Sequence, residues 1–217
     1  PRFRRHAFGW RSPPAVQRVK EAITEIQKAA RKDPILAATG AVVFLEKVSP
    51  ALEQVDSSSG AIGTAVNHAI EALARIIANA PVDDKTRDLW LERLWEAHQS
   101  DQIPYIECLG DYWGELCGSR ERAAAWADQL IGTVEMSWSP NRKPRGYFHG
   151  TIACLSAMLR AERHEQLLAL LEKAPYSTWH YREWGVKALV AMGRKADAIR
   201  YAEASRGLND SPVAIAR

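Results

Sequence analysis

Apolar residues recur at helical spacing along most of this chain. The first such stripe predicts an amphipathic helix over 15–31 and consists of Val16, Val19, Ile23 and Ile26. The next segment, 35–48, is apolar on nearly every side, which is typical of a helix buried in a core. Further stripes predict helices over 61–77 and 85–98. The pattern therefore predicts an all-α fold.

The stretch 178–207 has the most regular pattern and predicts two helices joined by a tight turn. The first helix carries an apolar stripe that includes Trp184 and Leu189, and the second carries small residues such as Ala198. Gly193 follows the last periodic residue of the first helix, where a left-handed backbone is easiest for glycine. We therefore expect a helix–turn–helix hairpin here.

The same outline occurs twice more upstream. At an offset of 75 positions, Gly118 corresponds to Gly193. At an offset of 31 positions, Arg163 corresponds to Arg194. Recurrence of one helical hairpin is typical of a stacked helical array. The three hairpins are expected at 104–131, 148–174 and 178–207.

The last hairpin resembles a tetratricopeptide repeat. Gly193 corresponds to the family's turn glycine, Ala198 to its small residue in the second helix, and Tyr201 to the aromatic residue nearby. The chain departs from the family in three ways: its period of 31 is shorter than the usual ~34, the Leu-Gly pair of the first helix is absent, and an insertion separates the first two copies. The resemblance, over about half of the chain, implies a right-handed superhelical array of antiparallel hairpins. It also implies a non-catalytic scaffold that binds a protein or peptide on its concave face.

These patterns divide the chain into a basic aromatic arm (1–14), a helical region (15–100) and the hairpins (104–217), of which the last two can also be one continuous domain. The arm has four arginines and no acid; without them, 25 of the 29 basic residues remain against 26 acidic ones. Because the body lacks a basic excess, nucleic acid is not the expected partner. We expect Phe8 and Trp10 to fold the arm back onto the body; the alternative is an arm that grips nucleic acid or another partner.

A serine-rich loop precedes the helix over 61–77 and offers the second function. Free backbone N–H groups and hydroxyls at a helix N-terminus favour an anion. The alternative function is therefore binding or turnover of an anionic small molecule, at Ser57, Ser58, Ser59, Gly60 and Thr64. No Walker lysine follows and no strand precedes, and a loop in which serine caps a helix explains the same residues.

The insertion 135–147 is expected to be a long loop, because it contains two prolines and a glycine. Long loops in compact folds are often functional, and this one clusters basic residues that suit an acidic partner; a mobile, solvated loop is the other interpretation. Aromatic residues in or beside loops are typical partner contacts. The candidate partner-binding residues are Tyr112, Trp138, Arg142, Arg145, Tyr147 and His180.

Catalytic and metal motifs are missing from the sequence. Asp111 and Glu115 lie four positions apart, a spacing more typical of solvated acids on a helix than of a metal pair. His149 and Cys154 lie five apart, which does not suit a nucleophile and its base. We therefore expect no catalytic residues, no metal site and no cofactor.

The remaining expectations concern the cellular context. The three cysteines form no CxxC pair and lie in apolar stripes, so we expect buried, reduced thiols. No apolar run reaches the ~18 residues of a membrane helix, and no signal peptide opens the chain, so we expect a cytoplasmic protein without a membrane partner. Ser211 and Pro212 predict the start of another helix, and an uncovered last hairpin would favour homo-oligomers.

Overall fold

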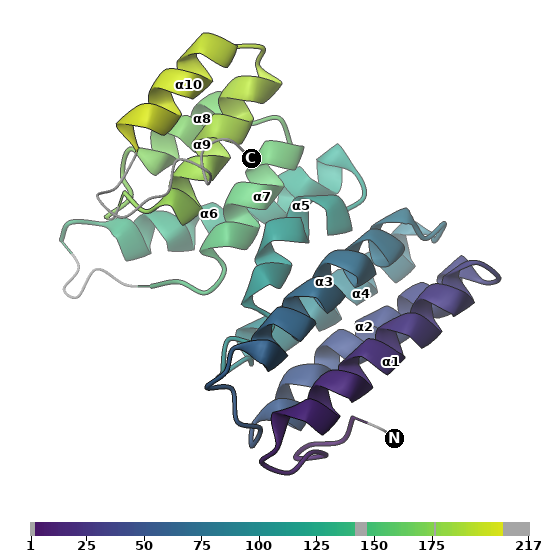
Figure 1. The fold of residues 1–217 in the computed structure, drawn as a ribbon. Coiled ribbons are helices and arrows are strands. Elements are labelled where there is room, and N and C mark those ends of the chain that lie inside the picture. Colours follow the sequence, from purple (N-terminus) through teal and green to yellow (C-terminus); the bar gives the residue numbers. More distant parts are fainter. Residues whose placement is uncertain (1–2, 142–146, 176, 206–217) are drawn as a thin grey trace. The chain divides into compact units, whose positions relative to one another are not determined.

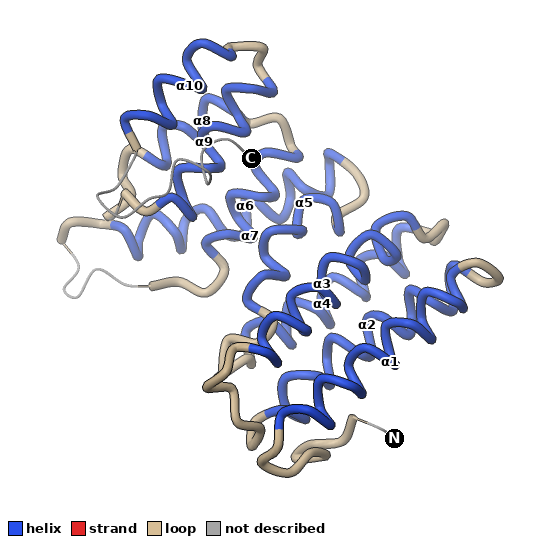
Figure 2. Tube along the Cα trace, in the orientation of Figure 1, coloured by secondary structure: helices blue, strands red, loops and turns tan. Residues whose placement is uncertain are grey.

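The computed structural model describes residues 3–141, 147–175 and 177–205 (Figure 1). Every regular element among these residues is a helix (Figure 2), which confirms the all-α prediction. The chain forms two compact units, 1–118 and 119–217. The division falls at Gly118, between the two helices of the first expected hairpin, whereas the sequence placed a boundary between 100 and 104.

From residue 3 onward, unit 1 forms four long helices followed by two short ones. The long helices are α1 (Ser12–Ala30), α2 (Pro34–Leu52), α3 (Ala61–Asn79) and α4 (Asp84–Gln99). The short elements are the 3₁₀ helix η1 (Glu107–Tyr112) and α5 (Trp113–Leu116). α2 packs against α1, α3 and α4, and α3 packs against α1, η1 and α5. The core of unit 1 therefore lies around α2 and α3.

α2 carries ten buried residues, more than any other helix of unit 1, which confirms the prediction for 35–48. By length and composition alone it is also apolar enough to cross a membrane, although 56% of its apolar window is buried in the unit. The charged pair Glu46 and Lys47 interrupts its apolar run, so α2 meets this criterion by its average composition and not as the continuous apolar run considered from the sequence. Core helices of soluble proteins share this property.

Polar side chains define the helix ends in unit 1. The carboxylate of Asp33 accepts a hydrogen bond from Leu36 N at 2.9 Å at the start of α2. The carboxylate of Asp83 accepts one from Thr86 N at 2.8 Å at the start of α4. Both are the N-caps that the sequence favours. The buried guanidinium of Arg87 donates to carbonyls at the C-terminal end of α3, including that of Ala80 at 2.8 Å.

The N-terminal arm lies on unit 1. Its backbone is held by hydrogen bonds from His6 N to the Pro50 carbonyl at 3.1 Å and from Asp56 N to the Trp10 carbonyl at 2.9 Å. Phe3, and not Trp10, provides the main apolar contact: its ring meets Phe44 edge-on at 5.0 Å, while Trp10 remains 72% exposed. The arm therefore folds back, as expected: Phe3 contacts α2, and Phe8 packs edge-on against Phe3.

The described residues of unit 2 form five helices: α6 (Arg120–Trp138), α7 (Thr151–Arg160), α8 (His164–Leu171), α9 (Trp179–Ala191) and α10 (Lys195–Ala204). Each of the pairs α6–α7, α7–α8, α8–α9 and α9–α10 packs together, and α9 also packs on α7. α9 is therefore the central helix of the later part of unit 2.

Three turns between helices have a residue with positive φ at corresponding positions. These residues are Gly118 (73°), Glu162 (58°) and Gly193 (76°). In two of these turns, the amide of the following residue donates a hydrogen bond to a carbonyl of the preceding helix. Arg163 N donates to the Met158 carbonyl at 3.0 Å, and Arg194 N donates to the Leu189 carbonyl at 2.9 Å. Such a bond satisfies a carbonyl at a helix end.

The cysteines of the chain are free thiols. Cys117 and Cys154 are buried and Cys108 is half-buried, so two of the three match the expectation. Burial raises the pKa of Cys154 to about 12, which keeps the thiol protonated at neutral pH.

Candidate peptide-binding groove

A groove lies between α8 and α10 of unit 2 and has a volume of about 570 Å³. Its apolar surface is provided by Leu168 and Ala169 of α8, Leu189 of α9 and the ring of Tyr201 of α10. Charged side chains of α8 and of the first turns of α10 surround this surface: Glu165, Glu172, Arg194, Asp197 and Arg200. The groove thus combines an apolar base with a charged border.

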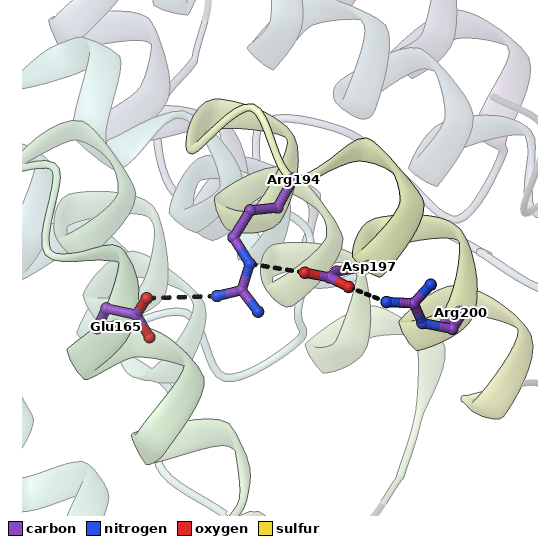
Figure 3. A network of polar contacts seen from close by, with 4 residues as sticks. All are labelled: Glu165, Arg194, Asp197 and Arg200. Carbon is purple, nitrogen blue, oxygen red and sulfur yellow. Dashed lines mark hydrogen bonds and ion pairs between the residues drawn. The ribbon is translucent and has the colours of Figure 1, made fainter.

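Four of the border residues form a chain of ion pairs (Figure 3). Arg194 Nη1 lies 3.4 Å from Glu165 Oε1, and Arg194 Nε donates to Asp197 Oδ2 at 2.7 Å. Asp197 also accepts a hydrogen bond from Arg200. The bond from Arg194 holds the pKa of Asp197 below its usual value, and the same bond raises the pKa of Arg194. Positive and negative groups therefore alternate along the border.

The turn at Gly193 explains how Arg194 reaches both acids. Gly193 adopts the left-handed conformation that ends α9, and Arg194 then becomes the N-cap of α10. From this position its side chain extends to Asp197, three residues ahead in α10, and to Glu165 in α8. Arg163 occupies the corresponding place before α8 and pairs with Asp128 of α6, its Nη2 lying 3.0 Å from Oδ2.

Tyr201 is held in place at the base of the groove. Its ring lies so close to Gly185 that a Cβ at that position would be 2.6 Å from Tyr201 Cε1. The Tyr201 hydroxyl accepts a hydrogen bond from Arg182 Nη1 at 2.8 Å, and the Arg182 guanidinium lies 5.6 Å from the ring centroid. Arg182 in turn pairs with Glu172 at 3.6 Å. Glycine in α9 therefore positions an aromatic side chain of α10.

The charged border of the groove is open to solvent. Its ion pairs are accessible to solvent, with 71% of the Arg200 side chain exposed, and such pairs contribute little to stability. A ligand's charges can thus replace them at low cost. The two carboxylates of the chain of pairs are already neutralised by arginines, so they are poorly suited to hold a metal ion.

Several donors of the serine-rich loop are already used within the loop and the first turn of α3. Asp56 Oδ1 already accepts the hydrogen bond from Ser58 N at 2.9 Å, and Gly60 N donates to the Ser57 carbonyl at 2.9 Å. The Thr64 hydroxyl donates to the Gly60 carbonyl at 3.1 Å. The bond from Ser58 N keeps the pKa of Asp56 low, so a negative charge already occupies the loop. Asp56 therefore accepts the Ser58 N–H that the sequence offered to an anion, and the anion site at 57–64 stays a prediction.

Trp138 and His180 both lie beside the ring of Tyr181 in unit 2. The Trp138 ring lies 5.3 Å from that of Tyr181, and Tyr181 lies 6.0 Å from His180. Trp138 is only 2% exposed, so in this structure it is a packing residue and is not accessible to a partner, in contrast to the expectation. The reason is that α6 continues to Trp138, whose ring packs against that of Tyr181 in α9.

The other expected partner contacts belong to different elements. Tyr147 is 68% exposed and its ring lies 6.1 Å from that of His149 in unit 2. Tyr112 ends η1 in unit 1, where partial burial raises the pKa of its hydroxyl. Arg142 and Arg145 lie outside the described residues, as does the helix start expected at Ser211.

The sequence reasoning missed the residues that form the groove. Gly185 looked like an ordinary helical residue, although a glycine within a buried helix is a signal of close approach by a neighbour. Tyr201 was noted only for its likeness to a repeat aromatic. The pairing of Glu165 with Arg194 joins two helices and has no local signal in the sequence.

No protein-family model matches the chain, and neither does any curated protein or any solved structure.

Proposed function

We propose that this chain is a non-catalytic helical scaffold that binds a segment of another protein in the groove between α8 and α10. The observation that carries the proposal is the groove itself. It has a volume of about 570 Å³, and its apolar base is bordered by exposed side chains of alternating charge. Interfaces of this kind combine an apolar centre with a polar rim. The expected ligand is a peptide with one apolar anchor residue and an acidic residue placed to meet Arg200.

The proposal includes the architecture expected from the sequence, a right-handed superhelical array of tetratricopeptide-like hairpins with a concave binding face. The positive φ values at Gly118, Glu162 and Gly193 support it, because they recur in the register of the predicted repeats. The arginines after the second and third of these residues support it as well, since each pairs with an acid of an earlier helix.

The contribution of the loop 135–147, the formation of homo-oligomers and the cytoplasmic location remain predictions. The loop prediction has its own test: Arg142→Ala together with Arg145→Ala should weaken the binding of any peptide that also requires Tyr147. Unchanged binding would remove the loop from the proposal.

A peptide selection on the full chain tests the groove. Peptides displayed on phage should be enriched by the native protein and should share the apolar anchor and the acidic residue. Ala169→Trp fills the groove from an exposed position of α8, and we expect it to weaken binding of the enriched peptides at least tenfold. Arg200→Glu should weaken the acidic peptides by a similar factor.

The matched control is Ala191→Trp, which adds the same side chain at an exposed position of α9 outside the groove. It should leave binding unchanged. The proposal fails if the enriched peptides bind native protein and Ala169→Trp equally well, or if the selection enriches no peptide.

A further inference from the structure

A second hollow lies in unit 1, between α1 and α2, and has a volume of about 400 Å³. α1 and α2 run side by side in Figure 1, joined by the short loop 31–33. Most of the lining is apolar: Phe3, Ala22, Ile26, Gly40, Val43 and Phe44. Ligand sites in proteins are typically hollows of ~300–1,000 Å³ with an apolar lining and a few polar groups.

The groove is open because Gly40 has no side chain. A Cβ at Gly40 would meet only Ile26 Cγ1, at 3.9 Å, so room remains above it. One turn further along α2, Val43 is 42% exposed although the helix is the most buried of its unit. A glycine inside a helix is destabilising relative to alanine, so Gly40 keeps the hollow open at the expense of helix stability.

The N-terminal arm forms one wall of this groove. The Phe3 ring lies against Phe44 at 5.0 Å and against Phe8 at 5.7 Å, both edge-on. The backbone bonds from His6 N to Pro50 and from Asp56 N to Trp10 keep the arm in place. The wall therefore has a fixed position although it belongs to a segment outside the helices.

The ammonium group of Lys47 belongs to the polar part of the lining. Lys47 borders the apolar groove and also a neighbouring hollow of about 380 Å³, which is lined by Arg5, Pro50, Glu53, Ser100 and Gln102. Arg5 is paired with Glu53 at 3.4 Å, whereas none of the described residues forms an ion pair with Lys47. The other charged residue of the apolar groove, Glu25, lies on α1. The free positive charge thus lies at the junction of an apolar and a polar hollow.

We propose that the α1–α2 groove binds a single amphiphile with an apolar chain and an anionic head, of the long-chain fatty acid type. The chain lies over Gly40 and Val43 and against the ring of Phe3, where it removes apolar surface from water. The head lies in the neighbouring polar hollow and pairs with Lys47. This site is in unit 1 and is independent of the peptide groove in unit 2.

Displacement of a fluorescent fatty-acid probe from the full chain tests the groove, with palmitate and hexadecanol as competitors. Gly40→Leu fills the groove while improving the helix propensity of α2, so it should fold as well as native protein, as checked by circular dichroism and thermal unfolding. We expect it to weaken palmitate binding at least tenfold. Gly132→Leu is the matched control, because Gly132 is an exposed glycine of α6 with open space around it, and it should bind as native protein does.

The head-group assignment has a separate test. Lys47→Ala should weaken palmitate severalfold and leave hexadecanol unchanged, because only palmitate carries a charge to pair with the ammonium. Lys28→Ala, at an exposed position of α1 outside the lining, should change neither. The proposal is overturned if Gly40→Leu binds palmitate as native protein does, or if palmitate displaces no probe from native protein. An equal effect of Lys47→Ala on both competitors would overturn the assignment of the head.

Discussion

At the scale of single residues, the contact between Gly185 and Tyr201 makes a sharp prediction. Alanine in a helix is usually more stable than glycine by about 0.5–1 kcal/mol. Here the added Cβ would lie 2.6 Å from Tyr201 Cε1, and the ring is held by its hydrogen bond to Arg182. We therefore expect Gly185→Ala to lower the free energy of unfolding by about 1–3 kcal/mol, measured by urea denaturation.

Two further variants isolate the cause of that loss. Gly132→Ala, at an exposed position of α6 with no neighbour near the new Cβ, should be slightly stabilising. Adding Tyr201→Leu to Gly185→Ala should recover part of the stability, because the smaller side chain leaves room for the methyl group. A Gly185→Ala protein as stable as the native chain would mean that the ring can move aside without cost.

The functional roles of single residues were the hardest feature to predict from the sequence. Trp138 stands beside a proline-rich segment, and this suggested an exposed loop residue, but only the packing of α6 on the later helices decides its burial. Ser58 suggested a donor to a ligand, and Asp56, two positions earlier, accepts its hydrogen bond instead. Local pattern identifies which residues can bind a partner, whereas the tertiary contacts decide which of them are already engaged.

At the scale of the elements, the turn between α7 and α8 makes the second prediction. Glu162 has a φ of 58°, a conformation that costs residues other than glycine roughly 1–2 kcal/mol. Glycine stands at the corresponding place in the turns at Gly118 and Gly193. We therefore expect Glu162→Gly to raise the melting temperature, with a gain of about 1 kcal/mol after its greater freedom in the unfolded chain is included.

Glu162 also pairs with Arg120 at 2.7 Å, and both side chains are more than half exposed. Glu162→Gln removes this pair and keeps the side chain at positive φ, so it should be neutral within about 0.5 kcal/mol. Gly193→Ala should destabilise unit 2, because it places a Cβ at a φ of 76°. A lower melting temperature for Glu162→Gly would show that the ion pair outweighs the backbone strain.

Elements were far more predictable than contacts. The apolar spacing identified α1 to α4, and aspartates before Pro34 and Asp84 marked the caps of α2 and α4. Turn positions with glycine were also identified, but the turn at Glu162 carries no glycine signal and could be placed only by its register with Gly193. Which helix packs on which depends on side chains far apart in sequence, so the grooves beside α1 and α8 had no local signature.

At the scale of the whole molecule, aspartates in both units make the stability of the fold depend on pH. The chain has 29 basic and 26 acidic residues, and four aspartates have lowered pKa values because they accept hydrogen bonds in the folded state. Asp56 and Asp83 accept them mainly from Ser58 and Thr86 in unit 1. Asp128 and Asp197 accept them from Arg163 and Arg194 in unit 2.

We therefore expect the free energy of unfolding to fall as the pH is lowered from 6 to below about 4. In the unfolded chain these carboxyl groups titrate near their ordinary value of 3.8, while in the folded chain they remain ionised to lower pH. The unfolded state thus binds more protons in this window, so stability present above pH 3.8 is lost as the pH falls through the lowered pKa values. Urea denaturation at a series of pH values measures the slope, and self-repulsion among the remaining cations steepens it.

Asp128→Asn assigns part of this slope to one ion pair. The variant should be less stable than native protein at neutral pH, because the amide carries no charge to pair with Arg163, and the two proteins should converge at acid pH. About 1 M salt should reduce the difference at neutral pH, since both partners are accessible to solvent, and should leave the bond between Asp83 and Thr86 N intact. A constant difference between Asp128→Asn and native protein from neutral to acid pH would mean that the pair with Arg163 does not contribute to the acid sensitivity of the fold.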